Sequence, residues 1–166
     1  MKNSIAERVA DFLQKHPPFL SLSMPDLIAI SRESQVVYLE KNQVLFNVND
    51  EPHSFFYIVK DGAVGLSISY DEKEILIDKC DEGDILGLRP FFAKDNYLMD
   101  AMAREESLLY AIPIAVFKTY VFQNAKVSEF LLESFASNTR NPYDKENKGK
   151  LISENVIYNE QDAIIQ

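Results

Sequence analysis

Hydrophobic residues follow a helical spacing at the start of the chain. They fall at intervals of three and four residues, at Ile5, Val9, Phe12 and Leu13. This spacing predicts a helix over about residues 4–15, which ends before Pro17. Ser23 has the chemistry of an N-cap residue and is followed by a second apolar stripe, so we expect another helix over about 23–31.

The same spacing returns after Pro113 and predicts helices over about 114–122 and 125–137. The last of these carries an apolar stripe at Val127, Phe130, Leu131 and Phe135. Residues 140–166 begin with a polar, charged run typical of a linker. We therefore expect one domain over residues 1–139 and a linker or tail over 140–166 that leads toward a further C-terminal region.

Between residues 35 and 113 the apolar positions alternate with a period of two, which indicates β-strands. Eight short strands are predicted, over about 36–39, 44–46, 55–59, 63–70, 75–77, 84–86, 97–103 and 108–112. Asp61-Gly62 is typical of a two-residue hairpin turn, and a second polar turn lies at 71–73. The predicted fold is mainly β, an eight-stranded β-roll or jelly roll with helices at both ends.

Charge and composition exclude several functions. The chain of 166 residues has a net charge of −9 and a pI of about 4.7, which opposes binding to nucleic acid or to an acidic membrane. No apolar run is long enough to span a bilayer, and the charged N-terminus does not resemble a signal peptide. A single cysteine, Cys80, cannot form an internal disulfide, so we expect a cytoplasmic protein.

The segment 84–99 could form an anion cradle, because a strand is followed by Gly87 and a short helical run over 88–93. Backbone N–H groups at a helix start have no internal partner, and a glycine lets a ligand approach them closely. Pro90 fits a first helical turn. The alternative is a corner of the roll that binds nothing.

Three motifs make the chain similar to the cyclic-nucleotide-binding domain: FYIVKDG at 56–62, GDILG at 83–87 and LYAIP at 109–113. The resemblance implies a sensor domain whose ligand is a cyclic nucleotide or another small anion. It places the binding site at Gly87, Leu88, Arg89, Pro90, Tyr97, Leu98 and Met99.

In this family a glutamate follows the cradle glycine and holds the ribose, and an arginine near the next strand pairs with the cyclic phosphate. Here Leu88 replaces the glutamate, and the segment 97–99 contains no basic residue. We therefore predict a degenerate pocket without ordinary cyclic AMP binding. Arg89 could supply a replacement charge; alternatively, it pairs with a neighbouring carboxylate, such as that of Asp84, Asp95 or Asp100.

The runs GLRPFFAKDNYLM and LLYAIP are also similar to a bacterial subgroup in which this sensor precedes a pair of CBS domains and a nucleotidyltransferase domain. The resemblance implies that residues 1–166 regulate such an output region. Any transferase activity would lie outside these residues, because none of its motifs occurs in them.

Catalytic and metal-binding chemistry has little support in the sequence. His16 and His53 are isolated, and there is no phosphate-binding loop or nucleophile elbow. We predict a non-catalytic regulatory domain with no metal site. The alternative is a dimerisation scaffold in which Leu88, Leu98 and Met99 fill the pocket and the stripe of the last helix forms a homodimer contact.

Overall fold

The computed structural model describes residues 4–137. Its helical elements are α1 (Ser4–Leu13), the 3₁₀ turn η1 (Phe19–Ser21), α2 (Met24–Arg32), α3 (Arg89–Ala93), α4 (Ile114–Gln123) and α5 (Ala125–Ser137). Its strands are β1 (Gln35–Leu39), β2 (Val44–Phe46), β3 (Phe55–Asp61), β4 (Val64–Tyr70), β5 (Lys73–Cys80), β6 (Ile85–Leu86), β7 (Asp100–Ala103) and β8 (Ser107–Pro113). The predicted eight strands and flanking helices are thus confirmed.

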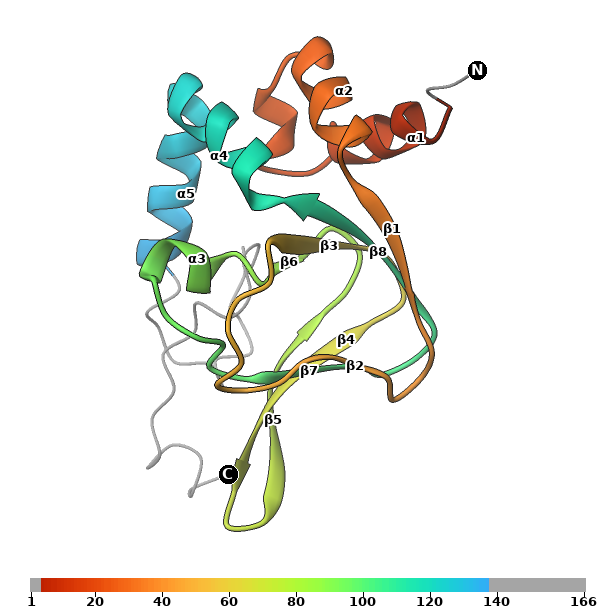
Figure 1. The fold of residues 1–166 in the computed structure, drawn as a ribbon, viewed down its shortest axis with the longest axis vertical. Helices are drawn as coiled ribbons and strands as arrows, with labels where there is room; N and C mark the ends of the chain where they lie inside the picture. Colours follow the sequence, from red (N-terminus) through yellow and green to blue (C-terminus); the bar gives the residue numbers. More distant parts are fainter. Residues whose placement is uncertain (1–3, 138–166) are drawn as a thin grey trace.

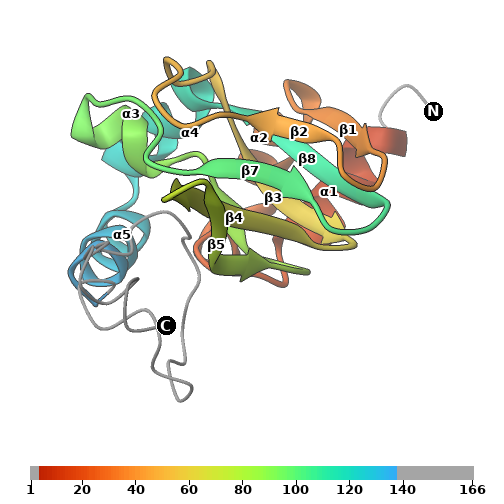
Figure 2. The same cartoon turned by 90° about the horizontal axis from the view of Figure 1, so that it is seen from below.

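The strands form two four-stranded antiparallel sheets, one in the order β1-β8-β3-β6 and the other in the order β2-β7-β4-β5. Figures 1 and 2 show α1, α2 and α4 gathered over the first sheet, while α3 and α5 lie together at the opposite side from α1. The fold therefore separates two regions, one around α3 and one around α1.

Two apolar clusters hold these layers together. One lies between the helices and the first sheet, and it includes Phe19, Phe56 and Phe117, each fully buried. The other fills the space between the two sheets and includes Phe46, Leu66 and Tyr97. Strand residues on opposite faces serve different clusters, because successive side chains of a strand point to opposite sides.

The predicted hairpin at Asp61-Gly62 is wrong. Strands β3 and β4 belong to different sheets and do not pair, so this segment is a corner at which the chain changes sheets. Gly62 has a φ of +92°, and a Cβ there would lie 2.5 Å from the carbonyl oxygen of Glu106. The glycine is required by this close approach to the start of β8. The tight hairpin lies instead between β4 and β5, where Asp71 and Glu72 both have positive φ.

Two other details differ from the prediction. Strand β7 begins at Asp100 and not at Tyr97, because the backbone of Tyr97 pairs with a loop: its N–H donates to Asp50 and its carbonyl accepts from Asn49. Ile5 is 62% exposed, whereas the other apolar residues predicted for the first helix are buried. The predicted N-cap is confirmed, since Ser23 Oγ accepts from the backbone N–H of Asp26.

The predicted linker or tail at 140–166 lies outside the described residues. None of the helices between residues 4 and 137 is long and apolar enough to cross a membrane.

Candidate functional site

The cradle has the predicted sequence of elements. Strand β6 pairs with β3 and ends at Leu86, just before Gly87, whose φ of +83° is suited to glycine. Leu88 is the N-cap of α3 and offers no side-chain hydrogen bond, and Pro90 lies in the first turn. Leu88 is fully buried and belongs to the helix-side cluster. An apolar packing residue therefore occupies the position of the family glutamate.

Arg89, the first residue of α3, is folded against the protein. Its side chain is 15% exposed and its Nη2 lies 3.9 Å from Oδ2 of Asp95. The predicted alternative, pairing with a neighbouring carboxylate, is confirmed for Asp95. However, Nε and Nη2 of this guanidinium are buried and have no hydrogen-bond partner among the described residues. Burying donors without acceptors is costly, so this arginine has unused capacity to bind an anion.

Arg89 lines a small cavity of about 230 Å³ together with Phe92, Ala93 and Phe135. The Phe92 and Phe135 rings have centroids 6.0 Å apart, and Phe135 comes from α5. The cavity therefore lies where α3 meets the C-terminal helix. A group bound by Arg89 would contact both helices.

The three residues at the position of the family arginine are placed in different environments. Tyr97 is fully buried, and its ring stacks on Phe46 at 3.7 Å with an interplanar angle of 6°. Met99 is also buried, in the cluster between the sheets. Leu98 is 43% exposed, so the prediction that it fills the pocket is wrong. Leu98 and Met99 form a bend before β7, and in this bend Leu98 faces outward while Tyr97 and Met99 stay buried.

His53 makes contacts that sequence reasoning missed. Its backbone N–H donates to the Tyr97 hydroxyl at 2.8 Å, and its Nδ1 lies 2.6 Å from the Tyr57 hydroxyl. Burial raises the pKa of Tyr57 to about 12, so this phenol stays protonated near neutral pH. Burial also lowers the pKa of His53, against the opposing effect of Asp50. His53 and Tyr57 are close in the sequence, but Tyr97 lies 44 positions away in the loop before β7, and no spacing signal predicts that contact.

The predicted dimer stripe on α5 packs against its own chain. Val127 and Leu131 are buried in the helix-side cluster, and Phe130 and Phe135 pack against it. Val127 and Leu131 are therefore part of the chain's own core, whereas Phe130 and Phe135 stay partly exposed, and a homodimer contact through this stripe stays a prediction. Helix α5 needs these residues to attach itself to the roll.

Among residues 4–137, no group of three or more His, Cys, Asp and Glu side chains is placed to hold a metal ion.

The two-sheet roll, the helical turn after Gly87 and the closing C-terminal helices are the elements of a sensor or regulatory module. A family model agrees with this class: residues 36–124 match the cyclic nucleotide-binding domain. The chain belongs to the cyclic nucleotide-binding domain family.

Solved structures with the same fold are only distantly related in sequence. The regulatory subunit of a cAMP-independent protein kinase A from Trypanosoma cruzi, bound to guanosine, has a TM-score of 0.70 and 15% identity, over 84% of this chain and 48% of that one. The sensor domain of the transcriptional regulator DNR from Pseudomonas aeruginosa has a TM-score of 0.68 and 22% identity, and the match covers 77% of this chain and 91% of that one.

A mutant of the corresponding Trypanosoma brucei subunit, with cAMP bound in its A site, has a TM-score of 0.69 and 16% identity, over 85% of this chain and 51% of that one. The chain thus spans about half of the length of these kinase subunits. No curated protein matches it.

Proposed function

We propose that this chain is a regulatory sensor that binds a small anionic ligand through Arg89, in place of the glutamate and arginine by which its family holds cyclic nucleotides. The observation that carries the proposal is the buried guanidinium of Arg89, whose Nε and Nη2 have no hydrogen-bond acceptor among the described residues. Asp95 neutralises it only in part, at 3.9 Å and with a side chain that is 57% exposed.

The size of the cavity indicates which part of a ligand would enter it. About 230 Å³ is below the roughly 300–1,000 Å³ of typical small-molecule pockets. We infer that a phosphate or carboxylate group enters, and that the rest of the ligand lies outside. The planar fork of an arginine binds both anions with two parallel hydrogen bonds.

The relatives support a ligand other than cyclic AMP. The T. cruzi subunit is described as cAMP-independent and is bound to guanosine. In the T. brucei protein bound to cAMP, one of three substitutions replaces a threonine with arginine. The segment 97–99 of this chain contains no arginine.

The signal would pass through α5. A ligand that pairs with Arg89 would move the contact between Phe92 and Phe135, and α5 would repack against the roll. This works only if the ligand binds the two arrangements with different affinities. By the resemblance described above, the receiver is a CBS pair with a nucleotidyltransferase, which stays a prediction.

Calorimetric titration with cyclic GMP, a cyclic dinucleotide and guanosine tests whether Arg89 binds the anionic group. We expect an anionic ligand to bind wild type and to lose at least about tenfold in affinity in Arg89→Ala, because one charge-assisted contact contributes about 1.5–3 kcal/mol. Lys94→Ala, at the other end of α3, is the matched control and should bind like wild type. Tight binding that survives Arg89→Ala would refute the role of Arg89.

A homodimer through the C-terminal helices is the second candidate. Phe122 on α4 and Leu132 on α5 are each 72% exposed, and large exposed apolar side chains favour association. We expect Leu132→Glu to shift sedimentation from dimer to monomer. A wild-type monomer at high concentration would remove this candidate.

A further inference from the structure

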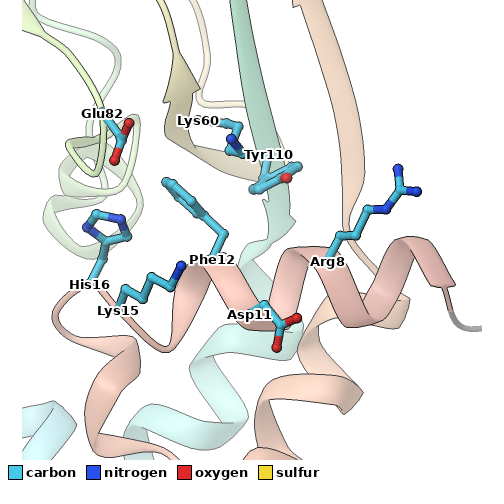
Figure 3. Close-up of a pocket in the computed structure, with 8 residues that line it drawn as sticks. All are labelled: Arg8, Asp11, Phe12, Lys15, His16, Lys60, Glu82 and Tyr110. Atoms are coloured by element: carbon cyan, nitrogen blue, oxygen red, sulfur yellow. The ribbon is translucent and has the colours of Figure 1, made fainter.

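A second pocket lies beside α1, on the opposite side of the molecule from α3 (Figures 1 and 2). It has a volume of about 470 Å³, within the usual range for small-molecule sites. Its walls come from α1, the end of β3, the middle of β8 and the turn before β6. We call it the α1 pocket; Figure 3 shows the eight residues that line it, Arg8, Asp11, Phe12, Lys15, His16, Lys60, Glu82 and Tyr110.

The floor of the α1 pocket is aromatic. Phe12 and Tyr110 are both more than nine-tenths buried, and their rings meet edge to face with centroids 5.5 Å apart. The His16 ring lies 4.4 Å from Phe12 at a tilted angle. Together these three rings offer a surface against which a flat, apolar group can pack.

Three cations surround this floor: Arg8, Lys15 and Lys60. None of them makes an ion pair within 4.0 Å in the part of the chain that the structure describes. Nζ of Lys60 lies 5.4 Å from the Phe12 ring centroid, so this charge is held directly over the floor. The chain as a whole has a net charge of −9, so three cations around one cavity give this region a charge opposite in sign to that of the chain.

The two acidic residues of the pocket offset only part of this charge. Asp11 also lines the pocket, and its Oδ1 accepts a long hydrogen bond of 3.5 Å from the side-chain amide of Gln14, just past the end of α1. Glu82 lies at the His16 end of the pocket, whereas Arg8 and Lys60 lie at the Tyr110 end. The pocket is therefore polarised, with an anion-accepting end above Tyr110.

We infer that the α1 pocket binds a small aromatic anion, a flat ring that bears a phosphate or a carboxylate. The ring would pack on Phe12 and Tyr110, and the anionic group would lie between Lys60 and Arg8. This site is separate from Arg89 and from the cradle, and its existence does not depend on the function proposed above.

Titration of the chain of 166 residues with phenyl phosphate, followed by two-dimensional NMR, tests the inference. We expect saturable shifts confined to α1, the end of β3 and the turn at Glu82, with a Kd of about 1 mM, and weaker binding at higher salt. Inorganic phosphate should bind at least about fivefold more weakly, because it lacks a ring to pack on the floor. Benzoate in place of phenyl phosphate distinguishes a carboxylate ligand from a phosphate ligand.

Lys60→Met is the decisive variant, because methionine keeps an unbranched apolar stem against Phe12 and removes the charge. It should weaken phenyl phosphate about tenfold, while Lys41→Met, in the turn between β1 and β2, should bind like wild type. The proposal is overturned if no saturation occurs by about 10 mM. Equal affinity in Lys60→Met, equal affinity for inorganic phosphate, or shifts confined to α3 would each overturn it as well.

Discussion

The cradle and the α1 pocket differ in how each uses its aromatic and charged residues. At the cradle the aromatic side chain is part of the core, since Tyr97 is fully buried against Phe46, and the guanidinium of Arg89 lies 3.9 Å from the carboxylate of Asp95. At the α1 pocket the rings form a floor, and three cations stand around it without ion pairs in the described chain. At the cradle these residues pack or pair within the chain, whereas at the α1 pocket they line a cavity, which is the basis for the ligand site that we propose there.

The largest expected effect tests whether Tyr97 is a packing residue. Tyr97→Ala should lower the free energy of unfolding by about 3–5 kcal/mol, because it removes a buried ring and leaves a cavity beside Phe46. Urea denaturation measures this loss. Tyr97→Phe is the matched control and should cost about 1 kcal/mol, since it keeps the stack and loses the acceptor for the His53 N–H. A loss below about 1 kcal/mol in Tyr97→Ala would contradict a packing role.

Gly83, beside the α1 pocket, and Gly87, in the cradle, have similar φ angles, so substituting each with alanine allows the two regions to be compared. A Cβ at Gly83 would lie 2.5 Å from Nδ1 of His16, whereas a Cβ at Gly87 would lie 3.4 Å from its nearest neighbour, Tyr57. Both substitutions to alanine strain a positive φ, at a cost of about 1–2 kcal/mol. We expect Gly83→Ala to cost about 1 kcal/mol more, because it must also displace the His16 ring. Thermal unfolding of the two variants measures this difference in stability. Equal stabilities would show that His16 is not held against this loop.

The third prediction concerns the unsatisfied charge of the cradle. Arg89→Met should leave stability unchanged or raise it by up to about 1 kcal/mol in the absence of ligand, because an apolar side chain suits the cavity beside Phe92 and Phe135 better than a guanidinium with unpaired donors. Lys60→Met should change stability by no more than about 0.5 kcal/mol. Chemical denaturation checks both values. A marked loss in Arg89→Met would mean that the arginine already has the partners it needs.

The smallest expected effect is a dependence of stability on pH in each region. Burial lowers the pKa of His53 near the cradle, and it lowers the pKa of His16 in the α1 pocket, where Glu82 opposes the shift and Lys15 adds to it. Between these lowered values and the ordinary value of 6.5, the unfolded chain binds more protons than the folded chain. The stabilisation is therefore fully present above pH 6.5 and is lost as pH falls through the folded pKa values.

Melting temperatures between about pH 7.5 and pH 5.5 measure this effect. His53→Gln and His16→Gln should each flatten the profile, and the double variant should flatten it further. A profile that keeps its full slope in the double variant would assign the pH dependence to other groups.

Much of the fold could be predicted because periodicity is a local property. The eight strands follow from alternation, and α4 and α5 follow from the helical spacing after Pro113. The partner of a strand is not a local property, which explains the error at Asp61-Gly62. The residues suit a tight turn, but the close approach of Gly62 to Glu106 at the start of β8 sets the actual path.

The candidate sites show the same limit. The replacement of the family glutamate by Leu88 could be predicted, because it needs only the motif around Gly87. The cavity beside Arg89 is lined in part by Phe135, which lies far along the chain in α5. The α1 pocket joins residues of four separate segments, so His16 looked isolated in the sequence although it lies against Phe12 and Gly83.

Cyclic AMP itself tests the central claim most directly, since the claim is that this family member lacks the charges that hold the cyclic phosphate and the ribose. Loss of both contacts should move a micromolar site, about −8 kcal/mol, to the millimolar range. Calorimetric titration of the wild-type chain should therefore give a Kd for cyclic AMP of about 1 mM or weaker. A micromolar Kd would contradict the account, because it would mean that other groups of the fold supply those charges.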